Sequence, residues 1–227
     1  MSLDVTFGPD EFQESTNVSR ETIERLETYS ALLKEWSAKL NLIGPGTVDH
    51  IWHRHFLDSA QFLPHGRPKD SATPQVWADV GSGAGFPGMV LAIMGASPMH
   101  LVEANSNKCE FLTAVGGATG TEVMIHGHRV EKMKRQDFSL TGPDVIAVRA
   151  VAPLPKLLKR LGGLLTPNTV LLLAAGQDIE SALTKAGKSW KMTVERLPSR
   201  THPASSILRI QDLHLNGAKA DKSQPAS

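Results

Sequence analysis

Residues 76–88 have the sequence VWADVGSGAGFPG, in which a short apolar run changes abruptly into closely spaced glycines and then into a second apolar run. This pattern predicts a strand, a tight turn and the start of a helix. Gly81, Gly83 and Gly85 lack a Cβ atom, so the backbone can turn sharply there and approach a ligand closely. In a parallel α/β sheet such a turn lies at the carboxyl end of the strand, beside a helix N-terminus. The stretch therefore predicts a nucleotide-binding loop.

The type of nucleotide is indicated by two acidic residues. Residues 83–88, GAGFPG, satisfy the G-x-G-x-x-G dinucleotide pattern, but this match alone is weak. Glu103 follows an apolar run 22 positions after Gly81, where a carboxylate can accept both hydroxyls of a ribose in either class of cofactor. Asp79 separates the classes, because a carboxylate just before the first glycine repels a pyrophosphate and attracts a cation. S-adenosylmethionine carries an ammonium and a sulfonium and no phosphate, so Asp79 favours it.

Several separated motifs resemble those of the GidB/RsmG family. In chain order they are HFLDS at 55–59, DVGSGAGFPG at 79–88, RVE at 129–131 and VRAV at 148–151. The similarity runs from about Tyr29 to Leu213, and the order of the motifs makes it more specific than any one of them. The chain departs from the family at LAAG, residues 173–176, where many members have a lysine before the glycine.

The resemblance implies an activity, a cofactor and a partner. Members of the family use S-adenosylmethionine to methylate N7 of a guanine in 16S ribosomal RNA. We therefore expect S-adenosylmethionine as the cofactor, and 16S ribosomal RNA or the small ribosomal subunit as the partner.

Composition narrows the class of protein. The chain has 227 residues with 24 basic and 23 acidic side chains and a net charge of +1, so any RNA contact depends on local basic clusters. A single cysteine, Cys109, excludes an intramolecular disulfide and a multi-cysteine zinc site. The N-terminus lacks a signal-peptide core, and apolar runs such as 170–175 are far shorter than the roughly 20 residues of a membrane span. We expect a cytoplasmic monomer that binds no metal and no membrane.

Strands and helices alternate after residue 76, which predicts an α/β fold with a doubly wound, mostly parallel sheet. With seven strands it is the Rossmann-like architecture of class I S-adenosylmethionine-dependent methyltransferases. Predicted strands occupy 76–80, 99–103, 122–126, 144–149 and 168–174, followed by a closing antiparallel pair at 192–197 and 206–212. Predicted helices occupy 87–95, 106–116, 153–164 and 178–187. The expected domains are an N-terminal helical extension (1–70), the methyltransferase domain (71–213) and a flexible tail (214–227).

The extension is expected to contain two helices after a loose lead-in over residues 1–18 that has at most one helical turn. The first follows Ser19 as its N-cap and has an apolar stripe that we interpret as core packing. That stripe consists of Leu26, Tyr29, Leu33, Trp36 and Leu40. The second helix is predicted from Thr47 to about Leu63.

The second helix is rich in histidine, and two interpretations of it stay open. Its histidines match no known metal-ligand spacing, so no metal site is predicted. The cluster His53, Arg54 and His55 is either an ordinary polar face or a contact for a phosphate backbone near the cofactor. The resemblance favours a functional use of His55 and Asp58.

Candidate cofactor-binding residues come from four places along the chain. They are Asp79, Gly81, Gly83, Gly85, Phe86, Glu103, Val130, Glu131 and Arg149. The family pair that matches Val130 and Glu131 contacts the cofactor, although Glu131 also suits a plain surface charge. Arg149 directly follows a buried apolar strand, where its rigid fork of donors can hold a carboxylate of the cofactor or an RNA phosphate. The candidate RNA contacts are His55, Arg129 and Arg149.

The chain lacks the residues that two other kinds of base methylation require. Residues 149–152, RAVA, replace the N/D-P-P-Y/F loop that serves adenine amines, and Cys109 lies away from the position of a pyrimidine C5 nucleophile. Guanine N7 has an exposed lone pair and no proton to lose, so we expect positioning residues such as Arg149 rather than a catalytic base. Two alternatives stay open: a methyltransferase of the same fold that acts on a small molecule or protein, and a nicotinamide-dependent reductase or nucleotide-binding module.

Overall fold

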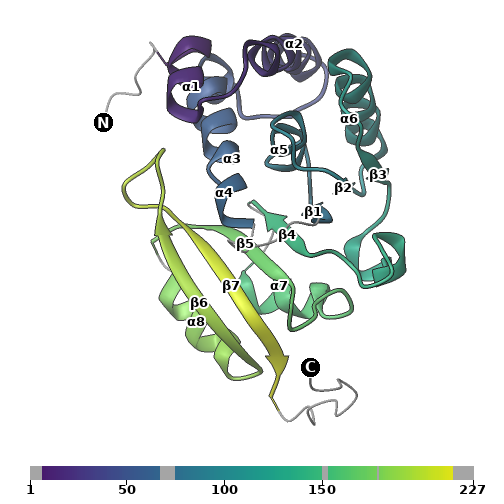
Figure 1. Ribbon diagram of the computed structural model, residues 1–227, viewed down its shortest axis with the longest axis vertical. Coiled ribbons are helices and arrows are strands. Elements are labelled where there is room, and N and C mark those ends of the chain that lie inside the picture. Colours follow the sequence, from purple (N-terminus) through teal and green to yellow (C-terminus); the bar gives the residue numbers. More distant parts are fainter. Residues whose placement is uncertain (1–6, 67–74, 150–152, 178, 217–227) are drawn as a thin grey trace.

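The structure is a computed structural model that describes residues 7–66, 75–149, 153–177 and 179–216. Its centre is a seven-stranded sheet of strand order β3-β2-β1-β4-β5-β7-β6 (Figure 1). Strands β1 to β5 are parallel, whereas β7 runs antiparallel to both β5 and β6. The strands are β1 (Trp77–Val80), β2 (Met99–Val102), β3 (Met124–His126), β4 (Val145–Val148), β5 (Val170–Ala175), β6 (Trp190–Pro198) and β7 (Ser206–Leu215). The predicted α/β fold with a closing antiparallel pair is confirmed.

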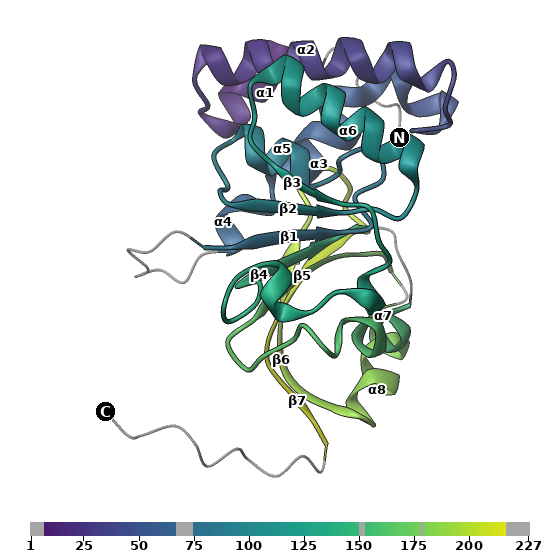
Figure 2. The same cartoon turned by 90° about the vertical axis from the view of Figure 1, so that its right-hand side faces the viewer.

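The inner strands are buried because helices cover both faces of the sheet, and their side chains are apolar except for Asp79 in β1 and His100 in β2. Every residue of β1, β2 and β4 is buried. Neighbouring side chains of β1 point to opposite faces, so Trp77 belongs to one hydrophobic cluster and Ala78 to the other. One face is covered by α5 (Gly88–Ile93) and α6 (Ser106–Thr119), and the other by α7 (Leu154–Leu161) and α8 (Ile179–Gly187) (Figure 2).

Helix α2 (Arg20–Ser37) forms a further layer over α5 and α6, and α1 (Pro9–Thr16) packs against α2 and the segment 52–57 (Figure 2). Ser19 caps α2 as predicted, because its hydroxyl accepts a hydrogen bond of 3.2 Å from the amide of Thr22. From the predicted stripe, Leu26, Tyr29 and Leu33 are buried in the same hydrophobic cluster as Phe86 and Met89, and the rest of the stripe is partly buried against it. The predicted extension thus shares one core with the face of the sheet that it covers.

The lead-in over residues 1–18 is more helical than expected in the part that the structure describes, because α1 is a helix of eight residues where one helical turn at most was expected. Pro9 stands at its first position, where a missing N–H costs nothing. The Glu11 carboxylate accepts a hydrogen bond of 2.8 Å from the Gly8 amide. Phe12 is fully buried and packs edge-on against Trp52 at 5.5 Å between ring centres. Phe12 therefore anchors this helix against a distant segment of the chain.

The single helix predicted over 47–63 is also wrong. The segment is divided into a 3₁₀ helix η1 (Pro45–His50), a π-helical turn η2 (Trp52–Leu57), and the short helices α3 (Asp58–Ala60) and α4 (Leu63–Gly66). Three consecutive residues, His55, Phe56 and Leu57, are all buried. A regular helix presents one stripe of side chains to a core, whereas a π-helical turn changes the direction of successive side chains. Such turns are frequent at functional sites.

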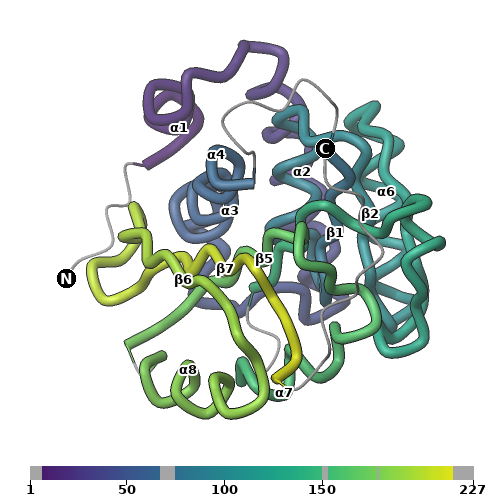
Figure 3. Tube along the Cα trace, turned by 60° about the horizontal axis from the view of Figure 1, so that its bottom comes forward, coloured from purple at the N-terminus to yellow at the C-terminus, as the bar shows by residue number. Residues whose placement is uncertain are grey.

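The remaining predicted elements agree with the structure except at their ends, where α6 continues to Thr119 and β7 to Leu215. The predicted boundary at 70/71 and the predicted tail beyond residue 216 lie outside the described residues. Within the described ranges, every helix is too short or too polar to cross a membrane. The turn between β6 and β7 reaches α3 and α1 (Figures 1 and 3), where the Arg200 amide donates a hydrogen bond of 2.9 Å to the Gln61 side-chain oxygen.

Candidate active site

The glycine loop joins β1 to α5 and has the predicted strand, turn and helix start. Gly81, Gly83 and Gly85 have φ angles of 77°, 57° and 95°, which side chains with a Cβ rarely adopt. A Cβ on Gly85 would lie 2.5 Å from the hydroxyl oxygen of Tyr29, so this position also has no room for a side chain. The loop therefore requires glycine for conformation and for space.

Glu103 directly follows β2 and lies against this loop, as the sequence predicts. Its carboxylate accepts hydrogen bonds from the backbone amides of Gly83, at 2.9 Å, and Asn105, at 2.8 Å. The side chain is partly exposed, and a carboxylate has more than two lone pairs. Glu103 thus braces the loop and keeps acceptor capacity for a ribose.

Asp79 lies behind the loop rather than on its open side. The side chain is fully buried, and its Oδ2 accepts a hydrogen bond of 2.9 Å from the Gly88 amide. Its Oδ1 is buried and has no hydrogen-bond partner among the described residues. Burial raises the pKa of Asp79 to about 7, although the Gly88 amide opposes this shift. The site therefore contains an unused acceptor that fits a donor or cation of a cofactor.

The segment after β3 begins a short 3₁₀ helix, η3 (Val130–Lys132). Val130 is buried in the core. Glu131 is exposed and pairs with Arg160 of α7, at 3.0 Å between its Oε1 and the guanidinium Nε. Arg129 is exposed on the same segment, and it is not among the residues that line the cavity described below. The structure therefore does not bring Arg129 together with the other two candidate RNA contacts.

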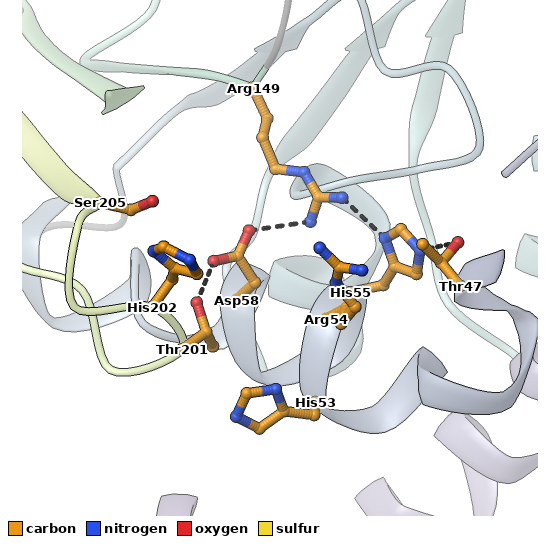
Figure 4. Close-up of a pocket in the computed structure, with 9 residues that line it drawn as sticks. All are labelled: Thr47, His53, Arg54, His55, Asp58, Arg149, Thr201, His202 and Ser205. Atoms are coloured by element: carbon orange, nitrogen blue, oxygen red, sulfur yellow. Dashed lines mark hydrogen bonds and ion pairs between the residues drawn. The ribbon is translucent and has the colours of Figure 1, made fainter. Parts of the chain in front are cut away.

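Arg149 follows β4 and is held between two residues of the N-terminal segment (Figure 4). One guanidinium nitrogen, Nη2, donates a hydrogen bond of 2.7 Å to Nδ1 of His55. The other, Nη1, lies 3.1 Å from Oδ2 of Asp58, an ion pair without a well-aligned hydrogen bond. The guanidinium carbon is 5.2 Å from the ring centre of Phe86. Arg149 therefore joins the end of β4 to η2, to α3 and to the glycine loop.

The protonation of His55 follows from these contacts. Burial and the neighbouring Arg149 lower the pKa of His55 to about 3, so the ring is neutral. An arginine can only donate, so Nδ1 of His55 is the acceptor and Nε2 carries the proton, which faces the Thr47 hydroxyl at 3.0 Å. Both ring nitrogens thus have protein partners, and the ring stacks on Phe86 at 4.8 Å.

A cavity of about 300 Å³ opens beside Arg149 (Figure 4). Its walls come from η2, α3 and the turn between β6 and β7, and include His53, Arg54, Asp58, Arg149, His202 and Ser205. A second cavity of about 210 Å³ shares Asp58 and Arg149 and is bordered by Ala174, Ala175 and Gly176. Many family members have a lysine before this glycine, whereas this chain has Ala175, so the side chains that this strand end places beside Arg149 are small.

The chain is similar along most of its length to a family of ribosomal RNA methyltransferases. The family model of GidB, the rRNA small subunit methyltransferase G, matches residues 22–206. The chain belongs to this family. The corresponding enzyme of Paramagnetospirillum magneticum is 43% identical over 206 residues, which cover 91% of this chain and 96% of that protein. That of Rhodospirillum rubrum is 42% identical over 207 residues, covering 91% of this chain and 98% of that protein.

Solved structures share the fold of this GidB-family chain at low sequence identity. A TehB-like S-adenosylmethionine-dependent methyltransferase from Corynebacterium glutamicum has a TM-score of 0.55 and 10% identity, covering 81% of this chain and 99% of that chain. A chain of the fibrillarin/Nop5p complex has a TM-score of 0.51 and 13% identity, covering 70% of this chain and 81% of that chain. The GidB-family chain is a methyltransferase that depends on S-adenosylmethionine.

Sequence reasoning missed two parts of the site of this GidB-family protein. Tyr29 was interpreted only as core, yet its hydroxyl bonds to the glycine loop. The turn with Thr201 and His202 gave no signal, because it meets Asp58 across 143 residues of sequence. Tyr29 and Ala84 of the glycine motif are likewise 55 positions apart in the sequence, so the apolar stripe gave no indication of their contact.

Proposed function

We propose that this chain transfers the methyl group of S-adenosylmethionine to N7 of a guanine in the 16S RNA of the small ribosomal subunit. The observation that carries the proposal is the family match over residues 22–206, which spans the glycine loop and the Arg149 cavity together. When bound, S-adenosylmethionine supplies an electrophilic methyl group on a sulfonium.

In this proposal, each cofactor-binding residue has a role that follows from its surroundings. Glu103 binds the ribose hydroxyls, since it lies beside the loop with acceptor capacity left. The loop glycines let the backbone approach the cofactor. Asp79 lies beneath the loop with its Oδ1 unpartnered, and a cationic cofactor above it favours the ionised form of this carboxyl, whose pKa burial raises to about 7. Val130 shapes the apolar side of the site.

Guanine N7 loses no proton on methylation, so the proposed reaction requires no dedicated base. His55 is neutral and uses both ring nitrogens, so it is not a base in this arrangement. Cys109 lies on α6, its thiol bonds to the Glu103 carbonyl oxygen, and burial raises its pKa, all of which make it a poor nucleophile. Arg149 is a positioning residue whose remaining donors reach the cofactor carboxylate or the RNA.

We also propose that the protein acts as a monomer on ribosomal RNA in the cytoplasm. The ribosomal RNA partner is supported by the relatives, which are ribosomal RNA small subunit methyltransferases. Sedimentation of the purified protein over a range of concentrations tests the oligomeric state.

The decisive experiment uses small subunits and naked 16S RNA from cells that lack this protein. Incubation with isotope-labelled S-adenosylmethionine is followed by mass-spectrometric mapping of N7-methylguanine. The expected result is label at one guanine, and none in subunits from cells that contain the protein, because that base is already methylated. Label in free metabolites or proteins but not in RNA would instead support the alternative of the same fold. Calorimetry with S-adenosylhomocysteine and NAD tests the cofactor class, and binding of NAD alone would contradict the proposal.

A further inference from the structure

The cavity beside Arg149 has two walls that lie far apart in the sequence. Arg54 of η2 borders it on one side, and His202 and Ser205 of the turn between β6 and β7 border it on the other (Figure 4). None of the three was predicted to bind cofactor, and the cavity lies next to the Arg149 that contacts Phe86 of the glycine loop. Whatever occupies the cavity is therefore close to the cofactor loop.

The acceptors that face the cavity are already engaged. Oδ1 of Asp58 accepts hydrogen bonds from the Thr201 hydroxyl, at 2.6 Å, and from Nε2 of Gln61, at 2.9 Å. Oδ2 of Asp58 faces Arg149. Nδ1 of His55 accepts from Arg149 as well. A ligand in the cavity therefore meets few free acceptors.

The donors, in contrast, are free. Among the described residues, the Arg54 side chain has no carboxylate within ion-pairing distance and no hydrogen-bond partner, and it is exposed. Nδ1 of His202 accepts a hydrogen bond of 3.1 Å from the Ala204 amide, so the proton of a neutral ring is on Nε2. The Ser205 hydroxyl adds a third donor. With two guanidinium groups and one carboxylate on its walls, the cavity carries an excess of positive charge.

We infer that this cavity is a phosphodiester-binding subsite, which holds the RNA backbone next to the target guanine between Arg54 and His202. A phosphate has only acceptors and a negative charge, which complement free donors and a net positive wall. This inference rests on the proposed RNA substrate. Within the candidate cluster of His53, Arg54 and His55, it assigns the backbone contact to Arg54 rather than to His55, whose nitrogens are both occupied, and it adds the β6–β7 turn.

The turn is fixed in place, so the two donors keep a defined separation. The Thr201 hydroxyl bonds to Asp58, and the Arg200 amide donates to Gln61 at 2.9 Å. The Arg200 guanidinium also donates to the Ser15 carbonyl oxygen at 2.9 Å. A site whose parts are already ordered loses little entropy when it binds a ligand.

The first test compares Arg54→Gln with Lys185→Gln, which removes an exposed charge on α8 outside the cavity. In methylation of small subunits, Arg54→Gln is expected to raise KM for RNA about tenfold with kcat nearly unchanged. The slope of log K against log salt concentration for RNA binding should become less steep by about one. An unchanged KM and an unchanged salt slope would overturn the inference, as would equal effects in Lys185→Gln.

The second test uses two substitutions of His202 that separate its nitrogens. His202→Asn keeps an acceptor near the position of Nδ1, and so the bond to the Ala204 amide, but removes the donor. His202→Gln keeps a donor near the position of Nε2 and loses that turn bond. The inference requires the Asn variant to weaken RNA binding more than the Gln variant. The opposite order would mean that His202 only shapes the turn.

A third measurement does not depend on methylation. Inorganic phosphate is titrated into the wild-type protein and into Arg54→Gln, and the imidazole NMR signals of His202 are followed. Millimolar phosphate should shift these signals in the wild type only, and a short RNA should do so at micromolar concentration. If both ligands shift His202 but subunits are never methylated, the subsite stands and the proposed function fails. If subunits are methylated and neither ligand shifts His202, the subsite is wrong and the function stands.

Discussion

The hydroxyl group of Tyr29 donates a hydrogen bond to the carbonyl oxygen of Ala84, which ties helix α2 to the centre of the glycine loop. The tyrosine is fully buried, and its ring stacks on Phe86 at 5.7 Å between centres. Burial raises its pKa well above the usual value, so the hydroxyl stays protonated and remains a donor. The N-terminal helices thus support the shape of the cofactor loop.

Tyr29→Phe is therefore expected to weaken cofactor binding as well as stability. Loss of the hydroxyl leaves the buried Ala84 carbonyl without its partner, at a cost of about 1–3 kcal/mol of folding free energy. Calorimetry should show a several-fold weaker affinity for S-adenosylhomocysteine. Thr28→Val is the control, because that hydroxyl bonds only within α2. A loss of stability without any change in affinity would limit Tyr29 to a structural role.

Glu103→Ala tests the assignment of the ribose contact. The variant should fold and bind S-adenosylhomocysteine at least tenfold more weakly, since a charge-assisted hydrogen bond to a hydroxyl is worth about 1.5–3 kcal/mol. Glu103→Gln is the milder variant, because it keeps one acceptor oxygen for either the Gly83 or the Asn105 amide. Affinity for S-adenosylhomocysteine and circular dichroism are measured together. Unchanged affinity in Glu103→Ala would refute the ribose assignment.

Asp79 predicts a dependence of stability on pH. Its folded-state pKa, about 7, lies above the ordinary value of 3.8, so the folded protein holds a proton that the unfolded chain releases. The contribution of Asp79 to stability is therefore present at low pH and is lost as pH rises from about 4 to 7. Asp79→Asn should remove this loss, so its urea midpoint relative to wild type should be higher at pH 8 than at pH 5. Equal differences at both values would contradict the buried, protonated carboxyl.

His100 predicts the opposite dependence. Burial lowers its pKa to about 4, and its Nδ1 lies 2.9 Å from Nε2 of His126, whose pKa is also lowered by burial. In the unfolded chain the histidine is protonated below about pH 6.5, whereas in the folded protein it stays neutral down to about pH 4. The free energy of unfolding therefore falls as pH drops from about 6.5 to 4. His100→Gln should reduce this acid sensitivity in denaturation curves between pH 7 and 4.5. His214→Gln, which alters an exposed histidine of β7 away from this pair, should leave it unchanged.

Local patterns in the sequence account for the sheet and the loop. The run from Val76 to Gly88 predicts a strand, a turn and a helix start because each step depends only on neighbouring residues. Glu103 could be placed because parallel strands end at one edge of a sheet. The alternation of apolar runs was enough to predict the order of strands and helices. Helices cover both faces of such a sheet, so each inner strand is buried and forms a short apolar run.

Contacts between distant segments account for the rest of the site. Nothing in the periodicity of residues 47–63 reveals the π-helical turn, which buries three consecutive residues against the core that the whole fold provides. Asp79 was placed correctly on its strand, but the side that its carboxylate faces depends on how α5 packs above it. The bond between Thr201 and Asp58 joins residues 143 positions apart. Hydrophobic pattern is a property of short windows of sequence, whereas the direction of a polar side chain is set by whichever partners folding brings within hydrogen-bond distance.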